Sequence, residues 1–560
     1  ENGKAVAGQN ELNFGEIVSQ VETWEEVATP QLKPLSEHQH IGKPIPRLDL
    51  ADKVNGKPIY GLDAELPNML FGAILRPHLV DAQLKNVDVS KAESMPGVVK
   101  VIQEEDFIGV VAESYYEAEQ AKEATEAEWD VNQTWSIADI EQKIKVGQGN
   151  AQVIQKNGSP DTILESEDII SAEYSSPMGA HAQLEPNGAV AYVENDKATV
   201  IMSTQVVEIT RKEVAKRLGF NKDQINIKPT FLGGGFGRRL HTPNAVQAAV
   251  MSKAVGRPVK SFFNRKEEFQ NDTFRPPTHH LLKAKLNDQG LIEAIEHNVS
   301  SGDVAYGSPL LPGIVNQIMG SDLGAWRGGM IQYTGIPNYQ AVSWRVKLPF
   351  ATSWWRSLGL LANTFAIESF MDELAEKAGK DPIEFRLAQI DDSERGKRLK
   401  SVIKKVRDAS AWNKQVDSGR SLGFACSTDV NVPCAQVVEV SYEKEQIKVH
   451  RVTCAIDPGL TINPDQVRAQ CEGSIMMGLS ASLYEKMTLE KSELKPIIYG
   501  PYKMALLRDT PEEIDVHILS GADEPGGIGE PPLGPVGAAI ANALYPLIGR
   551  RLRSMPLNEA

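Results

Sequence analysis

Short apolar runs separated by proline and glycine fill the chain from Ile41 to Asp130. Three of them have the length and the flanking turn residues of β-strands, and they lie at 59–62, 69–75 and 98–102. The segment 116–129 differs, because Ala118 and Ala121 repeat at helical spacing and its acidic residues would face water. We therefore expect a small α+β domain that ends in an amphipathic helix. The segment 132–160 shows no periodicity, which is typical of a linker.

From residue 168 onward, the pattern changes to paired strands that alternate with helices. Two hairpins with polar turns are predicted at 188–202 and 437–452, and a strand at 225–231 runs directly into a cluster of glycines. Helices are predicted at 206–218, 363–378, from 464 onward and at 536–547. We expect the helices at 363–378 and 536–547 to be half buried. This alternation is typical of mixed α/β domains.

Composition and charge limit the classes of function. Hydrophobic residues make up 41 % and charged residues 24 % of the 560 positions, as in folded chains. The 59 Lys and Arg residues face 74 Asp and Glu residues, and the net charge of −15 argues against nucleic acid as a partner. The mean hydropathy is −0.29, and apolar stretches such as 538–547 are shorter than the roughly 20 residues that a membrane-spanning helix needs.

The cysteines and histidines do not form recognisable metal-binding motifs. The cysteines are Cys426, Cys434, Cys454 and Cys471, and no two lie within the about three to five positions typical of zinc or iron–sulfur ligands. We expect them to pack in the core and to hold no iron–sulfur cluster. His181 and the pair His279-His280 have no second ligand at helical spacing, so we interpret them as core or surface residues.

A cluster of glycines and arginines follows the predicted strand 225–231. It reads Gly233-Gly234-Gly235-Phe236-Gly237-Arg238-Arg239. Glycine lets backbone N–H groups approach a ligand oxygen closely, and arginine forks onto phosphate or carboxylate groups. The cluster contains neither Gly-x-Gly-x-x-Gly nor Gly-Lys-Ser/Thr, and a tight structural turn would explain its glycines equally well. An anionic cofactor and a structural turn are both open at this point.

Two further segments place a charged group in restricted surroundings. Glu530 lies between Gly529 and Pro531-Pro532, directly before a predicted helix. A carboxylate on so rigid a turn suits a general base, although an ordinary exposed carboxylate would give the same pattern. Arg356 follows Trp354-Trp355, and its guanidinium needs an acceptor or an aromatic face that either a ligand or the core can supply.

In this order, the segments resemble the molybdenum-binding large subunit of the xanthine dehydrogenase and aldehyde oxidase family. The resemblance is closest to the isoquinoline 1-oxidoreductase β-subunit type, also known as the membrane-bound aldehyde dehydrogenase large subunit. Similar stretches lie at 41–49, 53–61, 180–187, 203–205, 233–237, 355–357, 372–375, 379–386, 463–465 and 529–532. The resemblance implies an α+β fold with a small α/β hammerhead domain followed by two mixed α/β molybdopterin-binding domains. The expected division is an arm at 1–40, the hammerhead-like domain at 41–131, a linker at 132–166, and molybdopterin-binding domains at 167–412 and 413–560.

The same resemblance implies roles for individual residues. Glu530 matches the catalytic base, Gln205 matches the glutamine that hydrogen-bonds the apical oxygen of the cofactor, and Arg356 matches an arginine on the opposite wall. The cofactor-binding residues that it implies are Gly234, Gly235, Phe236, Gly237, Arg238 and Gly529. Arg238 and its neighbour Arg239 would contact a cofactor phosphate or a carboxylate of the substrate. No side chain is expected to bind the metal directly.

The activity implied is that of a molybdenum hydroxylase, which oxidises an aldehyde or an N-heteroaromatic C–H bond with water as the oxygen source. The cofactor would be molybdopterin with molybdenum, in bacteria often as its cytosine dinucleotide. Electrons would pass to [2Fe–2S] clusters on a small partner subunit and then to a cytochrome or quinone-linked acceptor. The resemblance favours the periplasm and leaves the cytoplasm open.

One departure from the family pattern leaves an alternative open. The family's Met-Gly-Gln-Gly stretch and Gly/Ser-rich stretch, which hold the pterin, are not found here. Val146-Gly147-Gln148-Gly149 resembles the first of them, but it lies within the expected linker and lacks the flanking pattern, so we interpret it as a coincidence. We expect a further chain, encoded separately or produced by cleavage, to supply this part of the cofactor site, and a part of the same gene product outside this sequence is the other source left open. The alternative is a non-catalytic assembly subunit with the same fold and no molybdenum. A dinucleotide-dependent dehydrogenase is disfavoured, because the glycine cluster lacks the required fingerprint.

Overall fold

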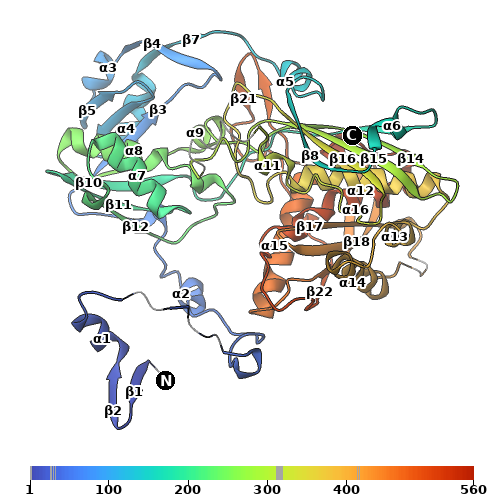
Figure 1. The fold of residues 1–560 in the computed structure, drawn as a ribbon. Helices are drawn as coiled ribbons and strands as arrows, with labels where there is room; N and C mark the ends of the chain where they lie inside the picture. Colours follow the sequence, from blue (N-terminus) through green and yellow to red (C-terminus); the bar gives the residue numbers. More distant parts are fainter. Residues whose placement is uncertain are drawn as a thin grey trace.

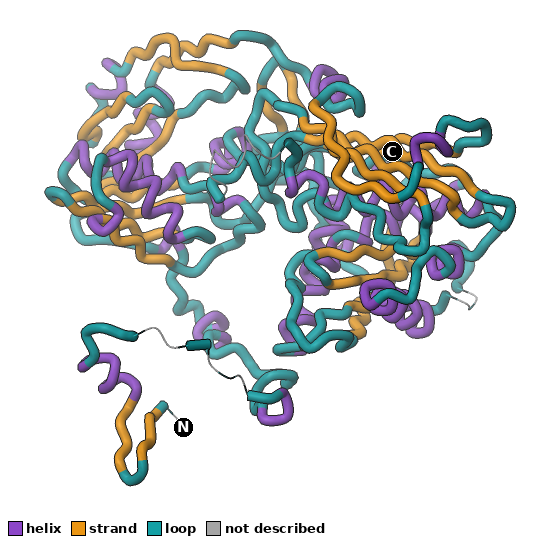
Figure 2. Tube along the Cα trace, in the orientation of Figure 1, coloured by secondary structure: helices purple, strands orange, loops and turns teal. Residues whose placement is uncertain are grey.

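A computed structural model describes residues 3–25, 28–29, 31, 33–310, 320–412, 414 and 416–560. Figure 1 shows two lobes, with the N-terminal arm below them. One lobe is built on a seven-stranded sheet, and the other on a five-stranded and a four-stranded sheet. Figure 2 shows helices gathered along these sheets and long loops where the lobes meet.

The seven-stranded sheet combines strands from two segments of the chain, 70–112 and 188–262. Its strands in spatial order are β12 (Ile225–Pro229), β11 (Lys197–Met202), β10 (Gly188–Glu194), β13 (Val259–Phe262), β3 (Leu70–Leu75), β6 (Ile108–Ala112) and β5 (Val98–Gln103). The helices α4 (Tyr115–Ala124), α7 (Val207–Leu218) and α8 (Pro243–Val255) pack against it. These elements confirm the predicted strands 69–75, 98–102 and 225–231, the hairpin 188–202 and the helix 206–218. Because β13 pairs in parallel with β3, the expected hammerhead region shares one sheet with residues beyond the expected linker.

Two predictions in this lobe are wrong. The run 59–62 is not a strand, since Gly61–Asp63 form a 3₁₀ turn that Asp63 closes by accepting the Tyr60 N–H at 3.0 Å. The expected helix 116–129 ends at Ala124, and β7 (Glu126–Val131) follows, paired with β4 (Ala82–Asp88). Exposed and half-buried residues alternate along β7, because acidic residues there alternate with apolar ones at the two-residue period of a strand.

The five-stranded sheet includes part of the expected linker. Its order is β8 (Asn150–Asn157), β16 (Asn338–Arg345), β15 (Ile292–Ser301), β14 (Thr278–Leu286) and β9 (Ile170–Ser176). The expectation of an irregular segment is wrong, because 132–166 contains β8 and the short helices α5 (Ile137–Lys143) and α6 (Pro160–Leu164). As an edge strand, β8 keeps most of its polar residues exposed, and so it has no apolar periodicity.

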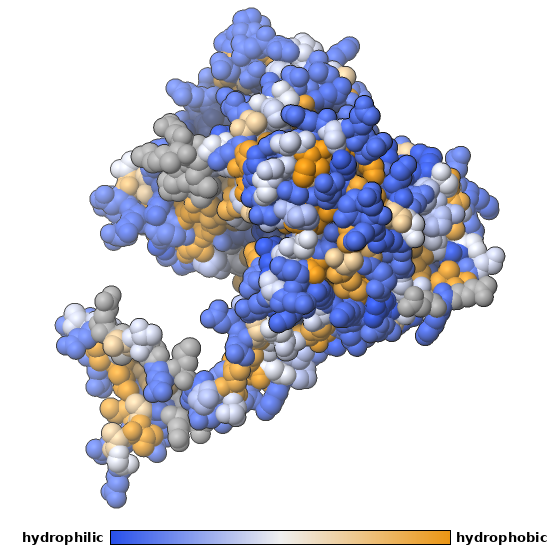
Figure 3. Space-filling view, turned by 45° about the vertical axis from the view of Figure 1, so that its right-hand side comes forward, coloured by the Kyte–Doolittle hydropathy of each residue, from blue (hydrophilic) through white to orange (hydrophobic). Residues whose placement is uncertain are grey.

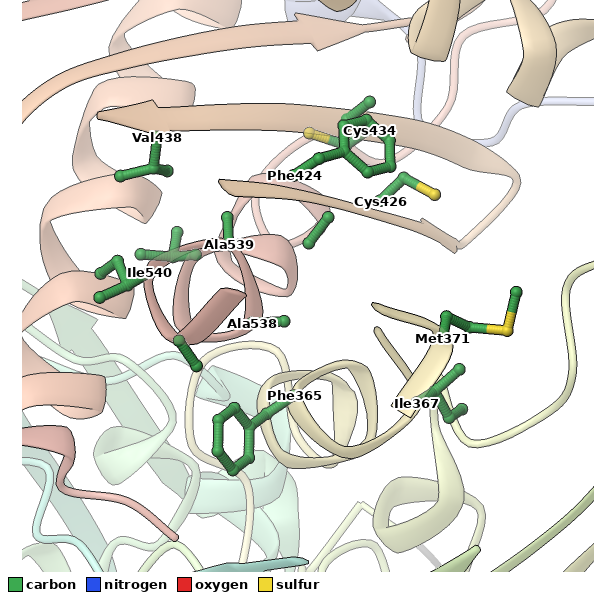
Figure 4. Packing of buried hydrophobic residues seen from close by; sticks show 14 of the residues in the cluster. Phe365, Ile367, Met371, Phe424, Cys426, Cys434, Val438, Ala538, Ala539 and Ile540 are labelled. Carbon is green, nitrogen blue, oxygen red and sulfur yellow. The ribbon is translucent and has the colours of Figure 1, made fainter. Parts of the chain in front are cut away.

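The four-stranded sheet and its helices form the largest core. The strands are β17 (Arg420–Asp429), β18 (Val432–Glu443), β19 (Gln446–Ile456) and β22 (Glu513–Ile518), and the helices are α12 (Leu360–Lys377), α13 (Pro382–Leu387), α14 (Glu394–Ala409), α15 (Pro464–Leu483) and α16 (Pro535–Ile548). Hairpin 437–452 and the helices from 363, 464 and 536 are confirmed. The expected half-burial of α12 and α16 is wrong. Helix α12 packs against both the five-stranded sheet and α16, and α16 packs on β17 and β18, so both are buried nearly all round (Figure 4).

The four cysteines lie in this core, as predicted. All are buried with free thiols, and burial raises the pKa of the Cys426 thiol well above its ordinary value. Cys434 Sγ lies 3.6 Å from Cys454 Sγ. None of the described helices combines the length and hydropathy that crossing a bilayer requires.

The arm carries apolar side chains without a core of its own. It contains β1 (Lys4–Ala7), β2 (Asn10–Asn13) and α1 (Phe14–Gln20), and none of these elements has a buried residue. Its surface includes the apolar patches at the lower left of Figure 3. Further along, the Gly42 N–H donates to the Ile462 carbonyl oxygen at 2.9 Å, and α2 (Leu50–Val54) then leads into the first lobe.

Candidate active site

The dipeptide Arg356-Ser357 joins two motifs that are far apart in the sequence. The Arg356 N–H donates to the Phe236 carbonyl oxygen (2.9 Å), and Arg356 Nε donates to the Gly529 carbonyl oxygen (2.8 Å). The Ser357 N–H donates to Glu530 Oε1 (3.0 Å), and the Ser357 hydroxyl donates to the Glu530 carbonyl oxygen (2.9 Å). The structure therefore brings together Glu530, Arg356 and the glycine cluster, which the sequence suggests only as three separate segments.

The glycine loop approaches Trp354, two residues before this dipeptide begins, too closely for any side chain at Gly237. That residue has φ +113°, and a Cβ atom there would lie 1.9 Å from the Trp354 carbonyl oxygen. Gly234, with φ +100°, also adopts a backbone that side chains rarely accept. Three non-glycine residues of the site are left-handed as well, namely Phe236 (φ 56°), Ser357 (φ 74°) and Leu358 (φ 53°). Such conformations cost about 1–3 kcal/mol each and cluster at functional sites.

Replacing Gly237 with alanine should lower the free energy of unfolding by about 2 kcal/mol or more, because the new Cβ displaces the Trp354 carbonyl and φ stays positive. Gly219, at the end of α7, is the matched control: its φ is +74° and a Cβ there meets open space. Gly219→Ala should lose only about 1 kcal/mol. Urea unfolding of both variants checks this, and equal losses would show that the contact with Trp354 is unimportant.

Gln205 supports the loop from the other side. Gln205 Oε1 accepts the N–H groups of Gly237 (3.2 Å) and Arg239 (3.3 Å), and the Gln205 N–H donates to the Arg239 carbonyl oxygen (3.2 Å). Gln205 is exposed, and Phe236 is 41 % exposed. Within the described part of the chain, Gln205 Nε2 and the N–H groups of Gly235 and Phe236 have no acceptor. These three donors are available to the oxygen atoms of a bound group.

The two arginines of the loop serve the protein interior. Arg238 is 1 % exposed; its Nε donates to Glu268 Oε1 (2.7 Å) and lies 3.0 Å from Asp272 Oδ1. Burial opposes its charge, but the two carboxylates raise its pKa. Arg239 donates through Nη2 to Glu185 Oε2 (2.7 Å). The expectation that these guanidinium groups contact a phosphate or a substrate is therefore corrected, since buried carboxylates already bind them.

Glu530 lies on the turn that leads into α16, as its prolines predict. The 3₁₀ turn Pro531–Leu533 follows it directly, and the Leu533 N–H donates to the Glu530 carbonyl oxygen at 3.0 Å. The Glu530 side chain is 30 % exposed, and its Oε2 lies 2.7 Å from Arg327 Nη1. Arg356 is half-buried and donates through Nη2 to Gln470 Oε1 (2.8 Å) on α15. Burial lowers the pKa of the Arg356 guanidinium, while the nearby Glu530 carboxylate opposes that shift.

Sequence reasoning missed the residues that surround this site. Arg327, Asp429 and Gln470 belong to no local motif, and their positions become informative only when the fold brings them next to Glu530 and Arg356. Glu185 did carry a signal, because it lies in the stretch 180–187. Its carboxylate accepts the Gly233 N–H at 2.8 Å and so fixes the start of the glycine loop.

The histidine predictions agree with the structure. His181 is buried, and its ring nitrogens lie 2.9 Å from Asp272 Oδ1 and 2.6 Å from the Trp354 carbonyl oxygen. His280 is buried beside His297, and His279 pairs with Glu173. In the described ranges, no group of three or more His, Cys, Asp or Glu residues is placed to hold a metal ion.

Comparison with known proteins identifies the family. A molybdopterin cofactor-binding domain model matches residues 144–390, a second such model matches 364–511, and the aldehyde oxidase and xanthine dehydrogenase a/b hammerhead domain model matches 55–125. The chain is 30 % identical over 550 residues to the beta subunit of isoquinoline 1-oxidoreductase from Brevundimonas diminuta, covering 94 % of this chain and 69 % of that one. This chain belongs to the molybdopterin-binding large-subunit family of the xanthine dehydrogenases and aldehyde oxidases.

Other relatives of this molybdopterin-binding protein show the same relationship. It is 28 % identical over 599 residues to the membrane-bound aldehyde dehydrogenase [pyrroloquinoline-quinone] of Gluconacetobacter polyoxogenes, covering 99 % of this chain and 77 % of that one. The aldehyde oxidoreductase of Desulfovibrio gigas has the same fold, with a TM-score of 0.79 at 19 % identity over 92 % of this chain and 80 % of that one. The expected hammerhead domain and two molybdopterin-binding domains are thereby confirmed.

The residues present fit a molybdopterin group. Such a group carries oxygen acceptors, and the free donors on Gln205, Gly235 and Phe236 are of the matching type. The backbone around Gly529 is open, because a Cβ there would approach nothing closer than Gln470 Oε1 at 3.7 Å. A planar group can therefore approach the Gly529-Glu530 turn without a steric clash.

Proposed function

We propose that this chain is the catalytic large subunit of a molybdenum hydroxylase that oxidises an aldehyde or an N-heteroaromatic C–H bond. For an aldehyde the balance is RCHO + H₂O → RCOOH + 2 H⁺ + 2 e⁻, so the substrate loses two electrons and gains an oxygen atom from water. The molybdenum cofactor supplies the redox chemistry when it is bound. The chain itself must bind and orient the cofactor, move a proton and keep the reacting groups in register.

The residues of the site suit these tasks. Gln205 Nε2 and the Gly235 and Phe236 amides, which have no acceptor among the described residues, would hold oxygen atoms of the cofactor. A carboxylate oxygen of Glu530 accepts the proton of the water-derived nucleophile, and general-base assistance of this kind contributes about 10²–10⁴-fold to a rate. Arg356 supplies positive charge next to the Gly529-Glu530 turn, where its Nε donates to the Gly529 carbonyl oxygen (2.8 Å).

One observation carries the proposal: the glycine loop and the Glu530 carboxylate are hydrogen-bonded to adjacent residues, Arg356 and Ser357. A cofactor held by Phe236 and Gln205 would therefore lie close to a carboxylate whose position is fixed. Glu530 accepts a backbone N–H through one carboxylate oxygen and pairs with an arginine through the other, so both oxygens are held in place beside the glycine loop. This arrangement favours the base over the structural interpretation.

We extend the proposal to the form of the cofactor, the partners and the location. The cofactor would be the cytosine dinucleotide form, and electrons would leave through a small [2Fe–2S] subunit to a cytochrome or quinone-linked acceptor in the periplasm. The names of two relatives support a multi-subunit enzyme, since one is named as part of an isoquinoline 1-oxidoreductase and the other as part of a nicotinate dehydrogenase. A third relative is named membrane-bound, which favours an acceptor at a membrane.

The test is analysis of the protein as purified with its partners. We expect close to stoichiometric molybdenum and pterin, oxidation of an aldehyde or N-heterocycle panel with a dye acceptor, and incorporation of label from isotopically labelled water into the product. Protein from cells grown with tungstate in place of molybdate is the matched control and should be inactive. Absence of molybdenum from carefully prepared wild-type protein would leave the non-catalytic assembly role as the better interpretation.

A further inference from the structure

Arg327 connects Glu530 to a second, buried carboxylate. Its Nη1 lies 2.7 Å from Glu530 Oε2, while its Nε and Nη2 each donate at 2.5 Å to one oxygen of Asp429. Arg327 follows the short helix α11 (Leu323–Trp326), and Asp429 is the last residue of β17. Three elements from different parts of the chain therefore meet at one guanidinium. The bidentate contact with Asp429 fixes the plane of the Arg327 guanidinium and leaves its Nη1 free to contact Glu530.

This arrangement is held rigidly. The side chain of Asp429 is 4 % exposed and that of Arg327 is 16 % exposed, against 30 % for Glu530. The Arg327 carbonyl oxygen accepts from Asn363 Nδ2 at 2.9 Å, which ties the backbone of Arg327 to α12. Burial opposes the charge on Arg327, but its hydrogen bond to Asp429 and the attraction of Glu530 raise its pKa, so it is a permanent cation.

A cavity of about 330 Å³ lies against the Arg327–Asp429 pair. Four of its lining residues carry buried polar oxygens that have no hydrogen-bond partner among the described residues, and they are Gln332, Thr364, Ser427 and Thr428. The Thr364 and Ser427 hydroxyls also approach Gly534, since a Cβ there would lie 3.1 Å and 2.9 Å from them. Two hydroxyls of the cavity lining thus lie next to Gly534, four residues after Glu530. A cavity with these polar groups can admit a small polar molecule or ion.

We propose that Arg327, oriented by Asp429, is a positioning residue that holds the Glu530 carboxylate in the geometry needed for proton transfer. This inference rests on the proposed function, because it assigns Glu530 as the base. Ser357 fixes one carboxylate oxygen through its N–H, and Arg327 fixes the other, so neither rotation of the carboxylate nor movement of the side chain is free. A displacement of about 1 Å in such a group can cost about a hundredfold in rate.

The first readout does not need turnover. The Ser357 amide donates to Glu530 Oε1, so its hydrogen–deuterium exchange reports whether the carboxylate stays in place. In the complex as purified, Arg327→Ala should accelerate exchange of this amide at least about tenfold, approaching the rate in Glu530→Ala. Arg395→Ala is the matched control, because the exposed Arg395 lines the same cavity and has the same charge, yet no contact with Glu530 is found for it. It should leave the Ser357 amide unchanged.

The second readout separates positioning from a purely structural ion pair. Arg327→Ala should lower kcat by about a hundredfold with KM changed much less. Millimolar guanidinium, which can enter through the cavity, should restore part of kcat, whereas urea, a neutral molecule of the same shape, should not. Asp429→Asn should give a smaller loss of about tenfold, because it leaves Arg327 charged but poorly oriented. This variant keeps the test valid if Arg327→Ala folds poorly.

Failure of the proposed function and failure of the positioning role of Arg327 give different results. If wild-type protein has no molybdenum-dependent turnover, the proposed function fails, and the exchange of the Ser357 amide alone decides whether Arg327 positions Glu530. Unchanged exchange in Arg327→Ala overturns the positioning role. Faster exchange with unchanged kcat in an active enzyme also overturns it, because Arg327 would then be only a structural contact. Faster exchange with guanidinium-specific rescue supports it.

Discussion

Replacing Glu530 with glutamine should lower kcat by about 10³-fold, while the molybdenum and pterin content stays the same. Glutamine is nearly isosteric, and its side-chain oxygen can still accept the Ser357 N–H that Glu530 Oε1 accepts at 3.0 Å. What it lacks is a basic oxygen for the proton and a charge for Arg327, which lies 2.7 Å away. Steady-state kinetics with parallel metal and pterin analysis checks this.

Glu524 provides the matched control for this prediction. It lies in the same loop six residues earlier and is exposed. Among the residues that the structure describes, no partner is found for its carboxylate, and its backbone oxygen accepts the Leu460 N–H at 3.1 Å. Glu524→Gln should keep full activity. Because Glu530→Gln also weakens the pair with Arg327, its thermal unfolding should be compared with that of the wild type. An activity loss matched by loss of cofactor or by unfolding would contradict the role of Glu530 as a base.

Much of the fold can be predicted from the sequence where one face of an element is apolar. The hairpins β10–β11 and β18–β19 and the helix α7 follow their periodicity, and Gly219 ends α7 in the left-handed conformation that glycine favours. The edge strand β8 was missed because its polar residues face water and leave no pattern. Half-burial was wrongly expected for α12 because a pattern of apolar positions does not show how many neighbours will cover a helix.

The candidate site follows the same division. Glu530, Arg356 and the glycine loop stand out locally, because glycine, proline and aromatic residues are concentrated beside them in the sequence. Arg327 and Asp429 are 102 positions apart and acquire meaning only through the tertiary fold, which pairs them. Arg238 was misassigned for a related reason. A sequence shows that an arginine follows a glycine loop, but not that Glu268 and Asp272 meet its charge inside the protein.

The residues with left-handed backbone at the site raise the free energy of the folded state, so contacts elsewhere in the fold must offset that cost. Phe236, Ser357 and Leu358 adopt positive φ without being glycine. The surrounding contacts must outweigh that cost, and those of Ser357 with Glu530 and of Phe236 with Arg356 are among them. The site therefore needs a rigid support, and one candidate for that support is the buried ion pair between Glu368 of α12 and Arg386 of α13, which also contacts β17.

That ion pair gives the largest expected effect on stability. Glu368 and Arg386 are completely buried; Arg386 Nε donates to Glu368 Oε2 (2.9 Å), and Arg386 Nη2 donates to the Glu368 carbonyl oxygen (2.7 Å). Glu368 also accepts from the Cys426 N–H (3.1 Å) and from the Tyr333 hydroxyl. Arg386→Met leaves this carboxylate unpaired in the core, so the free energy of unfolding should fall by about 3–5 kcal/mol.

A double-mutant cycle separates the penalty of the orphaned charge from the value of the pair. Adding Glu368→Gln to Arg386→Met removes the unpaired charge, so the double variant should recover part of the loss in urea unfolding. Arg407→Met is the surface control, since its pair with Glu384 is exposed and should change stability by less than about 1 kcal/mol. Equal losses in Arg386→Met and Arg407→Met would contradict the argument. Glu368 accepts from the Cys426 N–H on β17, and β17 ends at Asp429, which orients Arg327. Loss of the Glu368–Arg386 pair should therefore also make the position of Arg327, and with it that of Glu530, less well fixed.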